Sequence, residues 1–457
     1  MLAILYTIIA AVLWFQVMLG GSAKMAAMVT VGPVIGYYAL IEPTFFLASC
    51  LLVGEWQYKL GGGILQLTFY KLSLLALVAR TALDWYVRGS IARPKMWLYT
   101  YILVLLSIVL INGALASTTG SVGEVFGLVS YILLGLSCRV LLRTRNDLLN
   151  LMTGLSVALL CLGALAFAKS GFSALQVRFF RAEILGADPN EITTMALTWL
   201  LIGAPVLLMR DVSRIRKLLA FATFPTFLYL LFITASRGTT ISAAIGVGAL
   251  ALALPKRRSS RILGLSAFVL VIITIVAIAP ESYRFRMAET VQMSARSERP
   301  VINDAHRTEL AIESLKLIRE RPFFGHGTGM SARHNIKALG RGMTTHSMPL
   351  RLAESYGLFT LALIFALLFH GWRTIRNISH CAIDPNVRLA TIGITMALLA
   401  SSVASFGLTQ MFPRPMWLTL ALIAALDGSA LLSVEASKPV PRARSSWLRP
   451  RALADRI

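Results

Sequence analysis

The stretch MTTHSMPLRLAESYGLF, residues 343–359, places three ionisable side chains at the start of a long apolar run. Ser347 and Pro349 are suited to the N-cap and first turn of a helix, so His346 stands just outside it. Water, a lipid headgroup and a sugar can all reach such a position. An imidazole accepts a proton from a hydroxyl at neutral pH, which makes His346 a candidate general base. The alternative is a histidine that only hydrogen-bonds at the helix start.

Inside the same predicted helix, Arg351 and Glu354 are three residues apart. That spacing puts them on one helical face, where the two charges can neutralise each other. We therefore expect this pair to fix the helix rather than to react.

Arg237 lies in TASRGTT, residues 234–240, between two apolar runs. The connection is so short that the arginine must stay at the membrane edge, and we expect Gly238 to let the backbone turn tightly. A planar guanidinium can grip two phosphate oxygens with parallel hydrogen bonds. The alternative is an arginine that only anchors the helix end.

A third basic position is Arg181, with Arg178 nearby, in RFFRAEILGADPNE. Glu183 is a possible ion-pair partner, so a plain salt bridge is the alternative to a binding role. The Asp-Pro-Asn that begins at Asp188 is explained as a turn and N-cap leading into the next span.

These side chains need a scaffold, and the composition predicts a membrane-embedded one. The chain has 457 residues, of which 56% are hydrophobic and 14% charged, whereas soluble proteins carry about 25% charged residues. The net charge of +23 comes from basic residues clustered in alternate gaps between apolar runs and in the C-terminal tail. This positive-inside pattern predicts that the basic gaps and the C-terminus are cytoplasmic, and it argues against a nucleic-acid partner.

We predict an all-α, polytopic bundle of about 12–14 transmembrane spans. After a retained span at 2–19, the stretch 25–53 is broken by Pro33 and Pro43, and it can form one tilted span, two short ones or a hairpin. The other expected spans are 64–84, 96–116, 124–142, 147–169, 191–209, 218–235, 239–255, 262–280, 348–371, 389–409 and 416–433.

The resulting organisation is an N-terminal bundle at 1–280, a large outward loop at 281–347, C-terminal helices at 348–433 and a basic tail at 434–457. The loop is long enough to be functional. Within it, residues 306–322 are expected to form an amphipathic helix across the outer mouth, ending at Pro322. Ala311, Leu315 and Ile318 are predicted to form its apolar face, and Glu309, Glu313, Lys316 and Glu320 the opposite one. The glycines that follow, Gly325 and Gly327, permit unusual backbone angles, and residues 331–345 are expected to be a mobile flap.

We expect neither a metal nor a cofactor. The spacing of His326, His334 and His346 fits no compact metal motif, and the outward acids are single. The chain has no Walker loop and no dinucleotide fingerprint.

The order of these motifs resembles the bacterial O-antigen ligase and polysaccharide polymerase superfamily. The matching pieces are Arg181 to Asn190, then Ser236 to Gly238, then Arg307 through Gly327, and His346 through Leu358 with its Glu354-x-x-Gly357-Leu pattern. The resemblance is strongest over residues 230–425. It implies a helical bundle with a large periplasmic loop over a lipid-facing cavity, in the bacterial inner membrane.

The resemblance also implies the chemistry. Members of this family move glycans from an undecaprenyl-diphosphate carrier to an acceptor hydroxyl without a metal. His346 matches the histidine proposed to activate the acceptor, Arg237 and Arg307 match arginines taken to hold the donor diphosphate, and Arg181 matches a less certain basic position. Ser347 departs from the Asn that many relatives carry after the histidine, which leaves the acceptor-side hydrogen bonds open.

Two alternatives remain at this point. A ligase transfers finished glycan to lipid A–core, whereas a polymerase extends lipid-linked repeats, and the sequence does not separate them. A flippase for lipid-linked oligosaccharides is the alternative from another class, but a transporter would be expected to show inverted repeats and charges near the bilayer midplane. Attack by an activated hydroxyl in one displacement would invert the anomeric centre, and no outward carboxylate pair suggests a covalent intermediate.

Overall fold

The computed structural model describes eight stretches of the chain: 69–88, 97–116, 121–171, 188–253, 302–328, 330–339, 345–408 and 411–427. It also describes single positions at 44, 47, 262, 266, 269 and 273 and short pieces at 277–281 and 283–284. The expected spans at 2–19 and 25–53, most of 262–280 and the basic tail at 434–457 lie outside these residues.

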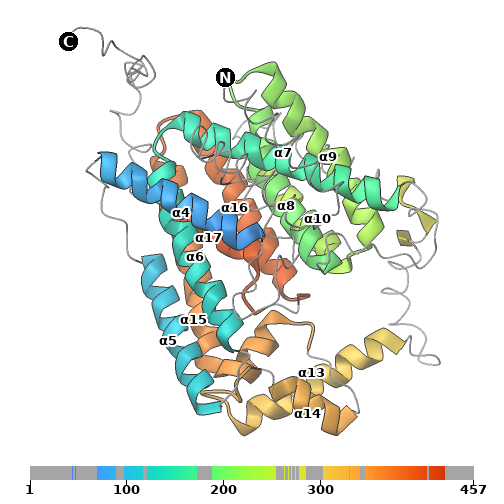
Figure 1. Ribbon diagram of the computed structural model, residues 1–457. Coiled ribbons are helices and arrows are strands. Elements are labelled where there is room, and N and C mark those ends of the chain that lie inside the picture. Colours follow the sequence, from blue (N-terminus) through green and yellow to red (C-terminus); the bar gives the residue numbers. More distant parts are fainter. Residues whose placement is uncertain are drawn as a thin grey trace, which may run out of the picture.

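Every regular element in the described part of the chain is helical (Figure 1). The elements are α4 Phe69–Arg88, α5 Trp97–Ala116, α6 Ser121–Leu141, α7 Arg145–Ser170, α8 Pro189–Gly203, the 3-10 helix η2 Ala204–Leu207, α9 Arg214–Thr234, α10 Arg237–Ala253, α13 Ile302–Glu320, α14 Met330–Leu339, α15 Met348–Cys381, α16 Pro385–Ser405 and α17 Arg414–Leu426. The predicted all-α class is therefore confirmed.

Seven of the described helical segments are long and apolar enough to cross a membrane, and α10 and α17 are shorter apolar helices. The seven are Trp97–Ala114, Gly123–Leu141, Arg145–Ala168, Pro189–Leu207, Arg214–Thr234, Met348–Cys381 and Pro385–Ser405. Each coincides with an expected span, so the chain is a multi-pass membrane protein. The total of about 12–14 spans stays a prediction.

The helix starts follow from local sequence. Thr144 and Asp147 form a reciprocal capping box at the start of α7. The side chains of Asp188, Ser213 and Asp384 accept backbone N–H groups at the starts of α8, α9 and α16. The Asp-Pro-Asn turn expected from sequence is thus confirmed as an N-cap followed by proline.

Helix α16 packs against α8 and α10 at close range. A Cβ added at Gly393 would lie 2.6 Å from the Leu201 backbone oxygen, and one at Gly246 would lie 3.0 Å from the Ala400 Cβ. Small residues allow membrane helices to approach this closely. On the other side of the bundle, Tyr131 of α6 stacks on Trp417 of α17 with ring centroids 5.1 Å apart.

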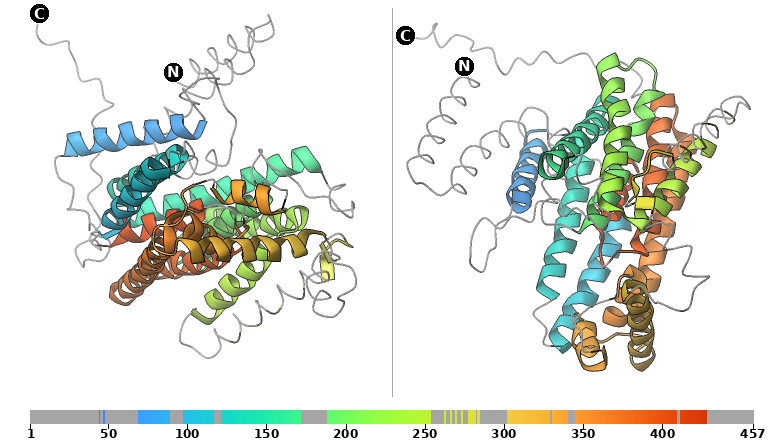
Figure 2. Two further views of the ribbon diagram at one scale, coloured as in Figure 1. Left: turned by 90° about the horizontal axis from the view of Figure 1, so that it is seen from below. Right: turned by 90° about the vertical axis from the view of Figure 1, so that its right-hand side faces the viewer.

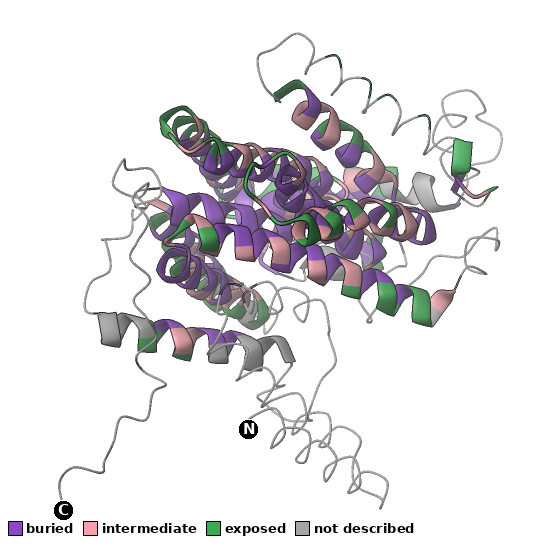
Figure 3. Cartoon of the chain, turned by 90° about the horizontal axis from the view of Figure 1, so that it is seen from above, coloured by how far each residue is buried: buried purple, intermediate pink, exposed green. Residues whose placement is uncertain are grey.

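Buried residues are concentrated where the helices face one another, and exposed positions lie on their outer faces (Figure 3). The exposed set includes many large apolar side chains, such as Leu75, Leu103, Ile215 and Phe221. On a soluble monomer such surface would be unusual. On a bundle of membrane-crossing length it is the surface that meets lipid tails.

The basic connections meet at one end of the bundle, which we call the basic end. Arg145 Nε lies 3.5 Å from Asp384 Oδ2, and Arg145 Nη2 donates to the backbone oxygen of Arg210. The Asn386 amide bonds to the Arg210 backbone through both its oxygen and its nitrogen. Connections far apart in sequence thus share one end, as the alternation of basic gaps predicts.

Helices α13 and α14 lie across the other end, the outer end (Figures 1 and 2). The helix expected at 306–322 is present as Ile302–Glu320. Its predicted faces are partly right, since Ile318 is buried and Glu309, Lys316 and Glu320 are exposed, but two positions are reversed. Leu315 is 56% exposed and Glu313 is 8% exposed. The carboxylate is buried because Lys316 and His334 both bind it. The expected flap at 331–345 contains a helix that the sequence did not indicate, α14 over Met330–Leu339, and its mobility stays a prediction.

Candidate functional site

At the outer end, the segment after α13 folds back onto α15 and is bonded to it. The backbone N–H of His326 donates to Glu354 O at 2.9 Å, that of Gly327 to Ser355 O at 2.8 Å, and that of Leu358 to Pro322 O at 2.7 Å. We call residues 321–328 together with 354–358 the clasp. It joins two motifs that are about thirty residues apart in sequence.

The clasp depends on glycine at two positions. Gly357 has φ 86° and ψ 169° and interrupts the helical geometry of α15. A Cβ there would lie 1.9 Å from the Phe323 carbonyl oxygen. Gly325 has φ 67°, and its Cβ would lie 2.5 Å from Tyr356 N. Both the backbone angles and the close approach exclude a larger residue.

The half-buried carboxylate of Glu124 ties the clasp to α6. Thr328 Oγ1 donates to Glu124 Oε2 at 3.0 Å, and the Tyr356 hydroxyl donates to the same oxygen. The two hydroxyl oxygens are 2.6 Å apart. Arg351 is within electrostatic range of this carboxylate and of Glu354. One carboxylate thus connects α6, the fold-back segment and the first turns of α15.

His346 precedes this assembly directly. Ser347 is the N-cap residue of α15, as expected, with φ −147° and ψ 114°, but its side chain makes no capping hydrogen bond. His346 is half-buried, between buried Thr345 and buried Met348 on either side of the cap. The imidazole is therefore held at the protein surface of the outer end, one residue before the cap.

A second cluster forms where α9 ends and α10 begins; we call residues 234–240 the corner. Ala235, with φ 45°, makes the turn. Ser236 then caps α10, because its Oγ accepts from Thr239 N at 3.3 Å. The prediction that Gly238 makes the turn is wrong: it lies inside α10, and nothing lies within 4 Å of a Cβ placed there.

Arg237 is the first residue of α10 and is half-buried. The amino end of a helix carries a partial positive charge. A guanidinium at this position adds to that charge, and the combination attracts phosphate. The corner therefore has the positive charge that an anion-binding position needs.

Hydroxyl groups join the corner to its neighbours. Thr234 Oγ1 and Thr193 Oγ1 are 2.8 Å apart, and Thr239 Oγ1 and Thr194 Oγ1 are 3.2 Å apart, which links the corner to the first turns of α8. Thr240 Oγ1 lies 2.7 Å from the Tyr283 hydroxyl. Burial raises the pKa of the Tyr283 phenol, and the hydrogen bond with Thr240 acts in the opposite direction.

The clasp and the corner lie at the same end of the bundle. Helices α15 and α16 are joined by three residues and run antiparallel, so the end of α16 lies near the level where α15 is interrupted. A Cβ at Gly407, just past α16, would lie 3.9 Å from Gly238 Cα in the corner. Both clusters are therefore remote from the basic end.

The other predicted binding arginines are less well defined. Arg307 lies in α13, but its side chain is outside the described residues, as is the whole of Arg181. The predicted neutralisation of Arg351 by Glu354 has a second participant, since Glu124 also interacts with the guanidinium. Sequence reasoning missed Glu124, Thr328 and Tyr356, although an acid at the outward start of an apolar span was a usable signal.

A polar contact joins helix α14 to α13. His334 Nε2 lies 2.9 Å from Glu313 Oε2, while Lys316 Nζ lies 2.7 Å from Glu313 Oε1. The hydrogen bond from Lys316, followed by that from His334, lowers the pKa of the Glu313 carboxyl. Glu313 is therefore a fixed anion that orients the His334 ring.

A cavity of about 320 Å³ opens between the clasp and the end of α5. Asn112, Arg321 and His326 supply its polar groups, and Phe323 and Phe324 are exposed beside it. The surface suits a molecule with both a polar and an apolar part. Over the described residues, no group of three or more His, Cys, Asp or Glu side chains gathers in a way that could hold a metal ion.

Comparison with known protein families gives one match. Residues 222–365 match the family described as O-antigen ligase, a range that contains the corner, the clasp and His346. No curated protein matches the chain. A solved chain from work on the structural coordination of polymerization and crosslinking by a peptidoglycan synthase complex is 18% identical, with a TM-score of 0.36. That match covers 80% of this chain and 98% of the other.

Proposed function

We propose that this chain transfers a glycan from an undecaprenyl-diphosphate carrier to an acceptor hydroxyl, because residues 222–365 match the family described as O-antigen ligase. The proposal rests on one observation above all: the matched range contains the arginine at the corner, the clasp and the histidine before α15. These are the residues that the chemistry requires, and they belong to the same end of a membrane bundle.

In this mechanism the corner holds the donor. A diphosphate gains charge as the bond from its oxygen to the anomeric carbon breaks. Arg237, at the positive end of α10, stabilises that charge with two parallel hydrogen bonds. Arg307 and Arg181 are proposed to add further positive charge from the outer segments. Fixed cations in a poorly hydrated site do here what a metal ion does in other transferases, so neither metal nor cofactor is invoked.

His346 is the proposed base. The acceptor oxygen attacks the anomeric carbon, its proton passes to the imidazole, and the diphosphate leaves with the electron pair of the broken bond. One displacement of this kind inverts the anomeric centre. The clasp has a supporting role: Gly325, Gly327, Gly357, Glu354 and Arg351 hold the start of α15, and therefore His346, in position.

The proposed setting is the bacterial inner membrane, with the basic end and C-terminus in the cytoplasm and the outer end in the periplasm. Donor and acceptor are then both lipid-borne: the acceptor is either lipid A–core, as for a ligase, or another carrier-linked glycan, as for a polymerase. The cavity beside the clasp is lined both by the polar groups of Asn112, Arg321 and His326 and by exposed Phe323 and Phe324, which supports an amphiphilic substrate.

The test is reconstitution of the purified full-length protein in vesicles with a lipid-linked glycan donor. Reactions with and without lipid A–core distinguish the two activities: a ligase forms product only with lipid A–core, and a polymerase extends the donor without it. We expect transfer under one of these conditions. Absence of transfer under both, with movement of the lipid-linked glycan across the bilayer, would replace the transferase by a flippase.

A further inference from the structure

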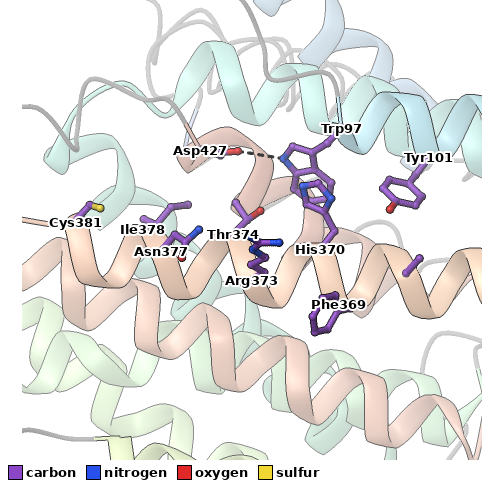
Figure 4. A pocket seen from close by; sticks show the side chains of 11 residues that line it. Trp97, Tyr101, Phe369, His370, Arg373, Thr374, Asn377, Ile378, Cys381 and Asp427 are labelled. Atoms are coloured by element: carbon purple, nitrogen blue, oxygen red, sulfur yellow. Dashed lines mark hydrogen bonds between the residues drawn. The ribbon is translucent and has the colours of Figure 1, made fainter.

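A groove runs along one face of α15 at the basic end, far from the corner and the clasp (Figure 4). It has a volume of about 630 Å³ and lies between α15, the start of α5 and the end of α17. The lining residues of α15 recur at helical spacing: Ala366, Phe369, His370, Arg373, Thr374, Asn377, Ile378 and Cys381. That spacing marks a single face of the helix.

The groove changes character along its length. The part nearer the bilayer centre is lined by Ala366 and Phe369, which end the apolar segment of α15. The part nearer the basic end is lined by Arg373, Thr374 and Asn377. An apolar half followed by a cationic, hydrogen-bonding half matches a molecule with a hydrocarbon chain and a polar head.

Aromatic rings form the opposite wall. Trp97 stacks on His370 with centroids 4.7 Å apart and planes 14° apart, and Tyr101 meets the same imidazole edge-on at 6.0 Å. Trp97 is also the first residue of a membrane-crossing segment. Tryptophan and tyrosine prefer the interface between hydrocarbon and headgroups, so the wall fixes the groove at that depth.

Two charged side chains line the groove, Arg373 and Asp427, and they differ in what surrounds them. Asp427 lines it, but this carboxylate accepts a hydrogen bond from Trp97 Nε1 at 3.3 Å and interacts with Arg139 of α6. Arg373 is exposed, and no ion pair joins it to a carboxylate among the residues that the structure describes. The guanidinium is therefore available to an incoming anion, whereas the acid is already bound.

From this arrangement we propose that the groove binds an anionic glycerophospholipid. Arg373 and Asn377 hold the phosphodiester at the headgroup level, and an acyl chain lies along Phe369 and Ala366. Basic pockets between membrane helices are suited to such headgroups. The site is separate from the glycan-transfer site and does not depend on the function proposed for it.

The test is native mass spectrometry of the delipidated full-length protein titrated with phosphatidylglycerol or with zwitterionic phosphatidylcholine. We expect the first phosphatidylglycerol to bind at least about five times more tightly than phosphatidylcholine. Arg373→Ala should weaken that first event about fivefold, the effect of one basic residue at a membrane surface. Arg376→Ala is the matched control, because Arg376 is exposed on the same helix but does not line the groove.

Four results would overturn the proposal. Equal affinity for the two lipids would remove the preference for an anion, and equal losses in Arg373→Ala and Arg376→Ala would indicate diffuse surface attraction. Competition by inorganic phosphate would identify a site for a soluble anion. Displacement by undecaprenyl phosphate at lower concentration than phosphatidylglycerol would assign the groove to the carrier lipid instead.

Discussion

The clasp and the corner lie at the same end of the bundle, yet they are built by different means. The clasp is held by three backbone hydrogen bonds and by glycines whose missing Cβ atoms leave room for the opposing chain. The corner is held by side-chain hydroxyls from Thr193, Thr194, Thr234, Ser236 and Thr239, and its glycine has open space around it.

This difference separates two tasks. Backbone bonds and steric exclusion allow one arrangement, so the clasp fixes the position of the segment that carries His346. Hydroxyl contacts are weaker individually and can exchange partners, so the corner can keep its cation at the membrane edge while a substrate enters. Substitution should therefore be most destructive in the clasp and more selective in the corner.

Gly357→Ala is expected to give the largest difference between a substitution in the clasp and one in the corner. A methyl group 1.9 Å from the Phe323 carbonyl oxygen, at φ 86°, cannot be accommodated without opening the clasp. We expect a loss of at least ~3 kcal/mol in stability, seen as a large fall in the thermal unfolding temperature of the detergent-solubilised protein and as loss of transfer. Gly238→Ala is the control, and it should be neutral or slightly stabilising because alanine favours helix. Similar behaviour of the two variants would remove the distinction between clasp and corner.

Arg237→Lys tests the binding role of the corner. An ammonium keeps the charge but cannot form two parallel hydrogen bonds with a phosphate. We expect a fall of about 100-fold in transfer with the unfolding temperature unchanged. Arg214→Lys, at the first residue of α9 on the basic end, is the matched control and should retain activity. Near-normal turnover of Arg237→Lys would mean that Arg237 only anchors the helix end in the membrane.

A double-mutant cycle on Glu124→Gln and Tyr356→Phe sharpens the account of how the clasp is tied to α6. Each single change removes one side of a partly buried hydrogen bond and should cost about 1–3 kcal/mol of unfolding free energy. The pair should lose less than the sum of the singles by about 1 kcal/mol. Additive losses would mean that the two side chains stabilise the protein independently.

The smallest effect on stability is expected when the contact of Glu313 between α13 and α14 is removed by low pH or by substitution. The pKa of Glu313 is lowered in the folded state, so its stabilisation is present above the ordinary carboxyl pKa of 4.5 and is lost as the pH falls through the lowered value. The protection factors of the α14 amides, which correct for the intrinsic pH dependence of exchange, should therefore be steady from neutral pH down to about 5 and fall below it. Glu313→Gln should show low protection at all pH values, and high protection in that variant would assign the docking of α14 to other contacts.

Much of the fold could be predicted from the sequence because hydrophobic length and charge placement act locally. The membrane-crossing segments coincide with apolar runs, and the basic gaps meet at one end as their alternation indicates. The burial of Glu313 on α13 could not be predicted, because it depends on His334, which is 21 residues away. The spacing of apolar residues contains no information about such a distant partner.

For the candidate site, the sequence nominates residues but not their assembly. It singles out His346 and Arg237 because charged groups at a membrane edge are costly, and their roles stay predictions. The bonding of His326 to Glu354 and of Leu358 to Pro322 was not indicated, because backbone hydrogen bonds leave no residue-specific pattern. Gly238 was assigned to a turn that Ala235 makes, since a left-handed alanine is rare enough for sequence to favour the glycine.

The most direct test of the account separates binding from chemistry at His346. Donor binding and transfer rate are measured for His346→Ala in the reconstituted protein, beside His380→Ala at the exposed, basic end of α15. The account predicts that His346→Ala binds the lipid-linked donor normally while transfer falls at least 100-fold, about the loss expected for a general base, and that His380→Ala is unchanged. Transfer by His346→Ala at the wild-type rate would contradict it.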